Sequence, residues 1–211
     1  KMENKEVRTI HEFSEIRADK KSRNVEGLGI VFNKESRDLG GFIEIILPEA
    51  MEGVIENSDI LALLDHQKQR GVLARSVNGK GSLATTITAA GVRYNYTAPN
   101  TPLGDEVREG IQRKDIRGSS FSFTIAKGGD KIEKRSDGVI VRTIKQFDKI
   151  FDISAVYTAA YTDTTVALRS LDEYNKANPP IDKTIEDKLA RPKLTNEELA
   201  MRSKNNYHIK N

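Results

Sequence analysis

Short apolar runs of β-forming residues, separated by glycine, proline and polar turns, dominate residues 25–170. Several runs alternate apolar and polar positions, the period of two that a half-buried strand requires. The predicted strands are 27–32, 42–47, 72–75, 82–88, 91–98, 115–125, 139–144, 150–157 and 164–169, and 60–64 is either a buried strand or a short helix. With so few helices between them, an antiparallel arrangement is favoured over alternating β–α–β units.

The helical signals of the central region are few. Leu103, Val107 and Ile111 recur every four residues among charged positions, which predicts an amphipathic helix over 103–113. A proline followed by acidic residues predicts one helical turn at 48–53. We therefore predict a mainly β fold with flanking helices (α+β), built as a closed or partly open antiparallel β-barrel.

The two ends of the chain differ in texture from its centre. Residues 1–24 are charge-rich with little periodicity, which indicates a leader strand or a flexible arm. After a linker at 178–180, polar segments at 184–190 and 195–204 could form helices without a wide apolar face. The predicted division is a charged N-terminal arm (1–24), a β-barrel domain (25–171) and a polar, partly helical C-terminal tail (172–211).

Composition narrows the chemistry. The chain of 211 residues has no cysteine, which excludes disulfides, thiolate catalysis and cysteine zinc sites, and it permits a reducing interior. The net charge of +3 is too small to indicate nucleic-acid binding, and the basic clusters lack interleaved aromatic residues. No apolar run approaches the roughly 20 residues of a membrane span, so no membrane partner is expected. Dinucleotide-binding and Walker glycine patterns are missing, and we expect no cofactor.

Histidine is scarce, with only His11, His66 and His208 in the chain. That scarcity argues against a histidine-rich metal site, and we expect no metal. It also makes candidate general bases easy to enumerate. His66 is the best placed of the three, because it follows the apolar run 60–64 and could lie at the edge of a cleft.

The strand 115–125 carries the candidate nucleophiles. Phe121 and Phe123 fall on one face with Ser119, whereas Ser120 and Ser122 fall on the other. The apolar face is expected to be buried and the hydroxyl face to point at whatever lies opposite. By phase alone, either Ser120 or Ser122 could be activated by a histidine, while Ser119 should point inward.

A serine nucleophile also needs an acid that orients its base. Asp152 and Asp148 both lie near the start of the strand 150–157 and are the leading candidates. Asp65 is a weaker candidate, because adjacent side chains diverge and its carboxylate would have to fold back toward His66. Taken alone, these signals also fit an ordinary surface histidine and ordinary strand serines, and no GxSxG motif is present.

The order of four segments resembles the prohead (capsid maturation) serine proteases of tailed bacteriophages, which are similar in fold to herpesvirus assemblin. The resemblance covers about residues 25–170. Its four segments are Gly29–Asn33 with Leu39–Glu44, Leu63–His66 with Val72–Arg75, Gly110–Phe123, and Phe151–Val156 with Val166–Arg169. The resemblance implies an assemblin-like β-barrel in the domain 25–171 and serine endopeptidase activity.

Transferred residue by residue, the resemblance makes His66 the general base and Ser120 the nucleophile. Asp152 fits the closing segment best as the acidic third member, with Asp148 second. Ser122 occupies a place where the family usually has a small residue, Gly or Ala, and Ala155 and Ala159 stand where prolines are common. These departures affect local geometry without removing the predicted catalytic groups.

The resemblance also implies partners and a setting. The expected substrates are the phage major capsid protein and the scaffold protein, and self-cleavage and a homodimer stay open. The expected location is the host bacterial cytoplasm, inside the procapsid. The alternative is a catalytically inactive capsid-assembly or scaffold factor on the same fold. The presence of both His66 and Ser120 favours the protease, because a degenerate copy would be expected to lose one of them.

Overall fold

The computed structural model describes residues 5–10, 13–157, 171–172 and 174–179. The chain divides into two compact units, Lys1–Asp172 and Glu173–Asn211, and all the elements named below lie in the first unit. His11, His208, the predicted strand 164–169 and the predicted helices 184–190 and 195–204 lie outside the described residues. The three-part division of the chain therefore stays a prediction.

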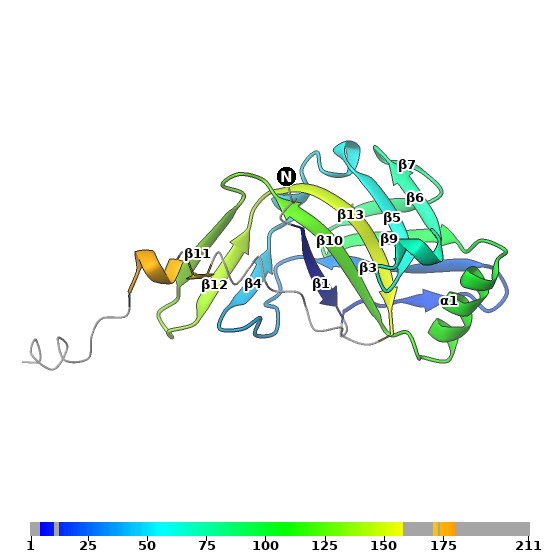
Figure 1. Ribbon diagram of the computed structural model, residues 1–211, viewed down its shortest axis with the longest axis horizontal. Coiled ribbons are helices and arrows are strands. Elements are labelled where there is room, and N and C mark those ends of the chain that lie inside the picture. The colour runs from blue at the N-terminus through cyan, green and yellow to red at the C-terminus, as the bar shows by residue number, and fades with distance from the viewer. Residues whose placement is uncertain (1–4, 11–12, 158–170, 173, 180–211) are drawn as a thin grey trace, which may run out of the picture. The chain divides into compact units, whose positions relative to one another are not determined.

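The largest sheet has six strands and joins segments that are far apart in sequence. From one edge to the other, its strands are β1 (Glu6–Ile10), β10 (Gly118–Ile125), β13 (Phe147–Val156), β5 (Asp59–Leu64), β6 (Ala74–Val77) and β7 (Lys80–Gly81). Figure 1 shows the first four of these strands side by side. The charge-rich N-terminal segment thus contributes a strand, the first of the two alternatives that its sequence left open.

Two smaller sheets complete the β structure. The four-stranded sheet contains, in order, β2 (Arg17–Ala18), β3 (Asn24–Val31), β9 (Gly91–Thr97) and β8 (Ala84–Thr88). The three-stranded sheet contains β11 (Asp130–Lys134), β12 (Ile140–Ile144) and β4 (Ile43–Ile46). Within residues 13–157, the helical elements are the 3₁₀ turns η1 (Pro48–Met51), η2 (Ile55–Asn57) and η3 (Lys68–Arg70) and the helix α1 (Pro102–Gln112).

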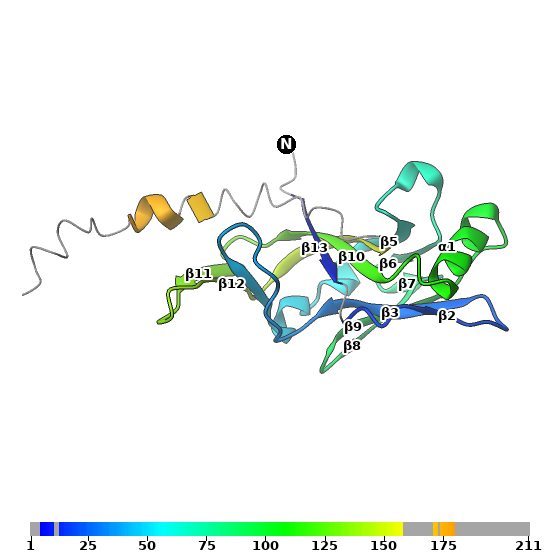
Figure 2. The ribbon, with the colours of Figure 1, turned by 90° about the horizontal axis from the view of Figure 1, so that it is seen from below.

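The main core lies between the six-stranded and four-stranded sheets, which Figure 2 shows as two layers. Its buried side chains include Val25, Ile30, Tyr94, Phe121, Phe123 and Ile153. Close approach of β3 depends on glycine, because a Cβ added at Gly29 would lie 3.0 Å from the Ile153 side chain. The layers therefore bury the phenylalanine face of β10, as its alternation predicts.

The predicted mainly β class with few helices is confirmed, whereas a closed and purely antiparallel barrel is not found among the described residues. Among the described residues the strands form three separate sheets, and none of them closes on itself. In addition, β5 pairs parallel with β13, and β4 pairs parallel with β12. Short hairpins force antiparallel pairing, but strands joined by long connections can pair in either direction. The sequence pattern contains no signal for the direction of such distant pairs.

The helix α1 confirms the predicted amphipathic segment. The Thr101 hydroxyl accepts a hydrogen bond from the backbone N–H of Gly104 (3.3 Å), a capping interaction that satisfies one of the first turn's unpaired donors. Val107 and Ile111 are buried, so the periodic apolar face is the packed face. None of the described helices is long and apolar enough to cross a membrane.

Candidate active site

A tight turn at the end of β5 presents His66. Asp65 and His66 have positive φ angles of 48° and 60°, and the N–H of Gln67 donates to the carbonyl of Leu64 (2.9 Å). Two consecutive left-handed residues closed by such a bond are typical of a type I′ turn. Left-handed backbone is uncommon outside glycine and is found most often in Asn, Asp and His. The turn thus stops the strand abruptly and places the imidazole at its end.

The strand order brings three sequence-distant segments to this turn. On β13, Ser154 lies opposite Ser120 of β10, and Asp152 lies opposite Ser122. The last residue of β5, Leu64, lies opposite Ala155 on the other side of β13. Because directly opposed residues share one face of a sheet, the hydroxyl face of β10 continues across β13 toward His66.

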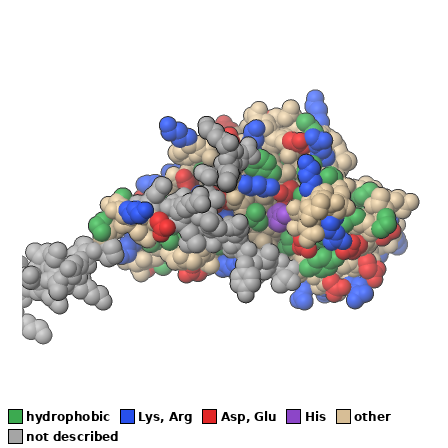
Figure 3. All heavy atoms as spheres, viewed as in Figure 1, with side chains coloured by type: hydrophobic (Ala, Val, Ile, Leu, Met, Phe, Trp, Pro, Cys, Tyr) green, Lys and Arg blue, Asp and Glu red, His purple; other side chains and the backbone are tan. Residues whose placement is uncertain are grey.

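A continuous chain of contacts joins the three predicted site residues. His66 Nε2 lies 2.7 Å from Ser120 Oγ, and His66 Nδ1 lies 2.5 Å from Asp152 Oδ1. Ser120 and Asp152 are 0% and 2% exposed, whereas the His66 side chain is 23% exposed. In the view of Figure 3, the imidazole reaches the molecular surface. The order serine, imidazole and carboxylate is the one that nucleophilic catalysis by serine requires.

The protonation of Asp152 fixes the tautomer of His66. Burial raises the pKa of Asp152, but hydrogen bonds from His66, Ser122 and Ser154 outweigh burial and hold this pKa below its ordinary value. An ionised carboxylate only accepts hydrogen bonds, so Nδ1 of a neutral His66 carries the proton. Nε2 is then left as the acceptor that faces the Ser120 hydroxyl.

The remaining candidates occupy other environments. Asp148 is exposed, and its nearest polar partner is the Thr124 hydroxyl at 3.3 Å. The Asp65 carboxylate accepts from the backbone N–H of Tyr157 (3.3 Å), whereas Nδ1 of His66 faces Asp152. Ser122 donates to Asp152 Oδ2. The structure thus brings Asp152, and neither Asp148 nor Asp65, to the imidazole.

The side chain of Ser119 points to the opposite face of β10. Its hydroxyl lies 2.9 Å from the Tyr94 hydroxyl within the core between the layers. The inward direction that strand phase predicts for Ser119 is confirmed.

The N-terminal strand β1 contributes contacts that sequence reasoning missed. The Thr9 hydroxyl donates to Ser120 Oγ (3.0 Å), and Ser120 Oγ lies 2.9 Å from the carbonyl oxygen of Arg8, which can accept its hydrogen. Lys5 Nζ lies 3.4 Å from Asp152 Oδ2. Nothing in the polar sequence of residues 1–24 indicates which strand it joins. The sequence did contain a signal for Ser154. It comes two residues after Asp152 in the same predicted strand, so the two side chains share one face.

We also searched the described residues for a pocket and for metal ligands near His66. A pocket of about 510 Å³ is lined by Arg8, Ile10, Glu44 and Phe121 among others, and neither His66 nor Asp152 belongs to its lining. In the described part of the chain, no group of three or more His, Cys, Asp or Glu side chains is arranged to hold a metal ion.

Comparison with known proteins agrees with a serine-based peptidase. Residues 11–177 match the family model described as caudovirus prohead serine protease, and the chain belongs to this family. It is a prohead serine protease of phage capsid maturation, which confirms the family and enzyme class expected from the four sequence segments.

One solved structure shows a distant similarity. It is the capsid assembly protease gp21 of bacteriophage T4, with a TM-score of 0.44 and 11% sequence identity over 75% of this chain and 99% of that chain. No curated protein sequence matches significantly.

Proposed function

We propose that Ser120 is the nucleophile of this protease, that His66 is its general base and acid, and that Asp152 orients His66. The continuous contact from Ser120 Oγ through the imidazole to the buried carboxylate carries this assignment. The pKa of Asp152, held below its ordinary value, keeps a negative charge beside the imidazole where an imidazolium forms during the reaction.

The reaction is amide hydrolysis through an acyl-enzyme. Ser120 Oγ attacks the scissile carbonyl carbon while His66 Nε2 takes the hydroxyl proton, and the carbonyl electron pair moves to its oxygen. Collapse of this intermediate breaks the C–N bond, and His66 returns the proton to the leaving amine. A water molecule, deprotonated by His66, then releases the acyl group and restores Ser120.

The substrates that we propose are the major capsid protein and the scaffold protein of the same phage, inside the procapsid in the host bacterial cytoplasm. Membership in the prohead protease family supports this class of substrate. Self-cleavage and homodimer formation are further parts of the proposal, and both can be read from the experiment below.

The test is co-expression of the chain with its capsid and scaffold proteins, followed by intact-mass measurement of every product. Ser120→Ala is expected to abolish processing, while Ser119→Ala, a change at the neighbouring core-facing serine, is expected to retain it. Circular dichroism checks that both variants fold, and gel filtration gives the oligomeric state. Processing that persists in folded Ser120→Ala would reject Ser120 as the nucleophile.

A further inference from the structure

The carboxylate of Asp152 needs more partners than His66 supplies. It is 2% exposed, so its two oxygens must find their hydrogen bonds within the protein. Oδ1 receives the His66 contact and a bond from Ser154 Oγ at 2.7 Å. Oδ2 receives the Ser122 hydroxyl and lies 3.4 Å from Lys5 Nζ. Each oxygen therefore has one serine hydroxyl among its partners.

Strand pairing fixes the two hydroxyls on either side of the carboxylate. Ser122 lies directly opposite Asp152 on β10, and Ser154 lies two residues further along β13 on the same face. Both serines are 0% exposed, so solvent does not compete for their hydroxyls. Their positions follow from the backbone of the sheet, which makes them a rigid support for the carboxylate.

We propose that Ser122 and Ser154 are positioning residues of the protease. Their two hydroxyls hold the Asp152 carboxylate so that Oδ1 faces the imidazole. This inference rests on the proposed roles of Ser120, His66 and Asp152. Ser122 reaches the carboxylate from the neighbouring strand β10, whereas Ser154 reaches it from the same strand, β13. The two hydroxyls therefore hold the carboxylate from two directions.

Loss of either hydroxyl has a signed effect on pH dependence. With fewer donors, the negative charge of Asp152 is less satisfied and attracts the proton of the imidazolium more strongly. The imidazolium of His66 then loses its proton at a higher pH, so the acidic limb of the rate profile moves to higher pH. Looser orientation of the imidazole lowers the plateau rate by about 10-fold, the scale seen for outer hydrogen bonds at functional sites.

Other charged groups near the site stay constant in this comparison. Lys5 faces Asp152 from the segment before β1. Asp65, beside His66, is bonded to the Tyr157 amide, and the Tyr157 hydroxyl donates to Glu106, which pairs with Arg70. None of these groups is altered by a change at Ser122 or Ser154.

The test uses a fluorophosphonate probe, which phosphonylates an activated serine and needs no knowledge of the cleavage site. The rate of labelling is measured between about pH 5 and pH 9, the range in which histidine titrates, with the labelled residue identified by mass spectrometry. Ser122→Ala and Ser154→Ala are each expected to slow labelling about 10-fold and to move the acidic limb upward by about half a unit. Ser122→Thr keeps a hydroxyl and should recover most of the rate.

Thr124→Val is the matched control, because Thr124 is the next residue on the same face of β10 and its hydroxyl contacts Asp148. It should label at the wild-type rate with an unchanged profile. Labelling of Ser122→Ala and Ser154→Ala with the wild-type rate and profile would overturn the positioning role alone. Failure of both the wild-type chain and Glu6→Gln, a change expected below to loosen β1, to label at Ser120 would instead overturn the proposed nucleophile.

A second and independent observation concerns access to Ser120. In the described part of the chain, β1 is the outermost strand of its sheet, and Thr9 lies directly opposite Ser120. The Arg8 carbonyl and the Thr9 hydroxyl both contact Ser120 Oγ, and Ser120 is 0% exposed. The scissile carbonyl of a substrate must reach that same oxygen. In this structure β1 therefore occupies the space that the substrate must enter.

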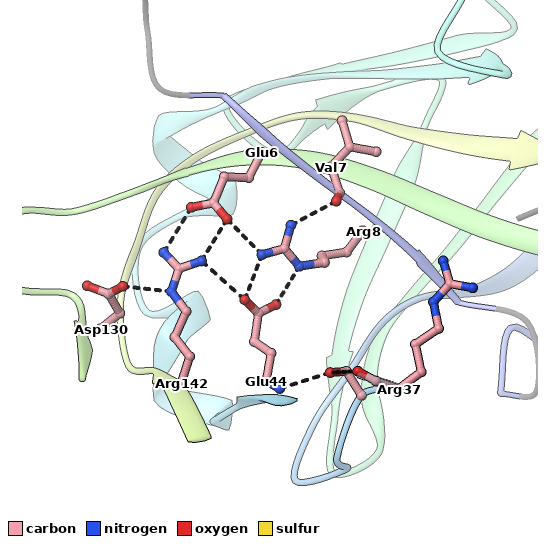
Figure 4. Close-up of polar contacts among 8 residues, drawn as sticks. Glu6, Val7, Arg8, Arg37, Glu44, Asp130 and Arg142 are labelled. Atoms are coloured by element: carbon pink, nitrogen blue, oxygen red, sulfur yellow. Dashed lines mark hydrogen bonds and ion pairs between the residues drawn. The ribbon is translucent and has the colours of Figure 1, made fainter. Parts of the chain in front are cut away.

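The opposite face of β1 is held by buried ion pairs, drawn in Figure 4. Arg8 contacts Glu44 of β4 through two bonds (2.7 and 2.8 Å) and also Glu6 (2.7 Å). Arg142 of β12 contacts Glu6 through two bonds (2.6 and 2.9 Å). The ion pairs thus tie β1 to the three-stranded sheet and keep its carbonyl on Ser120.

We infer that β1 is a movable cover, closed over Ser120 in this structure, and that substrate cleavage requires it to leave β10. This inference also rests on Ser120 as the nucleophile. The absence of native cysteine permits a reversible test, because Ile10 and Ser119 are direct cross-strand partners. Cross-strand Cα separations of about 4.5–5.5 Å fall within the range that a disulfide spans.

The experiment compares one protein, Ile10→Cys/Ser119→Cys, in its oxidised and reduced forms. The oxidised form, verified by mass, is expected to label with fluorophosphonate at least about 10-fold more slowly than the reduced form, since a disulfide prevents strand separation. Equal rates in the two forms would overturn the cover. Glu6→Gln, which removes a partner of Arg8 and Arg142, should raise the labelling rate several-fold, and an unchanged rate in this folded variant would also count against the cover.

Discussion

Strand β1 has a buried polar cluster on each of its faces, and the two clusters are built differently. On one face, the ion-pair cluster of Glu6, Arg8, Glu44, Asp130 and Arg142 joins three carboxylates to two guanidinium groups. On the other face, the hydroxyl cluster of Ser120, Ser122, Ser154, Asp152 and His66 surrounds one carboxylate with hydroxyls and an imidazole, and the Lys5 ammonium lies 3.4 Å away.

The difference lies in whether a proton can move. Burial raises the pKa of Glu6, yet Arg142 and Arg8 outweigh burial and leave this pKa below its ordinary value. The pKa of Arg142 is raised despite burial, because its carboxylate partners favour the charged form. Glu6 and Arg142 are thus both held in their charged states. The hydroxyl cluster instead places a hydroxyl, an imidazole and a carboxylate in contact, the arrangement that proton transfer from a serine needs. The structural and the chemical cluster thus lie on opposite faces of β1.

The largest effect is expected for removal of the charge in the hydroxyl cluster. Asp152→Asn should lower the rate of substrate cleavage by about 10,000-fold, because an amide favours the wrong tautomer of the imidazole. Asp148→Asn is the matched control on the same strand and should leave the rate within about 2-fold of wild type, since exposed side chains away from a site have small effects. Inactivation by Asp148→Asn instead would transfer the acidic role to Asp148.

The ion-pair cluster should show its largest effect in stability. Arg142→Met removes the guanidinium shared by Glu6, Glu44 and Asp130 and leaves buried carboxylates with too few partners. The free energy of unfolding in urea should fall by about 3–5 kcal/mol. Glu6→Gln/Arg142→Met should lose less than the sum of the two single changes, because they remove one interaction. Additive losses would show that the two residues do not act as a pair.

Acid should weaken both clusters in the same direction. Glu6 and Asp152 have folded-state pKa values below their ordinary values, so they bind fewer protons when folded than when unfolded at mildly acidic pH. Their stabilisation is present above the unfolded pKa, near 4, and is lost as pH falls through the folded pKa. Each proton contributes at most about 1.4 kcal/mol per pH unit to that slope.

The measurement is urea unfolding of wild type, Glu6→Gln and Asp152→Asn from about pH 6 to pH 3, the window set by a carboxyl pKa near 4. Each substitution should reduce the slope of stability against pH in this window. A slope unchanged from wild type would mean that the residue titrates alike in the folded and unfolded chain.

The smallest effect is expected for an exposed ion pair of good geometry. Arg75 donates two hydrogen bonds to Asp59 (2.6 and 2.7 Å), but both side chains are about half exposed. Arg75→Ala should cost no more than about 1 kcal/mol of unfolding free energy, because water screens the pair. A loss as large as that of Arg142→Met would show that burial does not explain the strength of the ion-pair cluster.

Much of the local structure follows from the sequence. The period of two in β10 places Ser120 and Ser122 on one face and Ser119 with Phe121 on the other, which the structure confirms. The apolar period of helix α1 is also found where the pattern predicts it. These features depend on neighbours within a few residues, so a local pattern is sufficient to predict them.

The arrangement of the site was only partly predictable. Strand phase alone could not decide whether Ser120 or Ser122 is the nucleophile. Position in the sequence could not decide whether Asp148 or Asp152 is the acid that orients His66. Parallel pairing of β5 with β13 is what brings the turn of His66 to Asp152, and this pairing joins residues that are far apart in the chain. The ion-pair cluster was hidden in the same way, since its charged residues come from β1, β4, β11 and β12 and look like surface positions in the sequence.

What the sequence by itself determined is the alternation of side chains along each strand, the helix α1 and, through four segments in order, the protease family. What only the tertiary structure decided is which strands are neighbours, and with them which carboxylate meets His66 and which strand covers Ser120. The physical reason is that alternation is set by the geometry of one strand. The choice and direction of strand partners instead depend on packing and buried charge pairing over the whole domain.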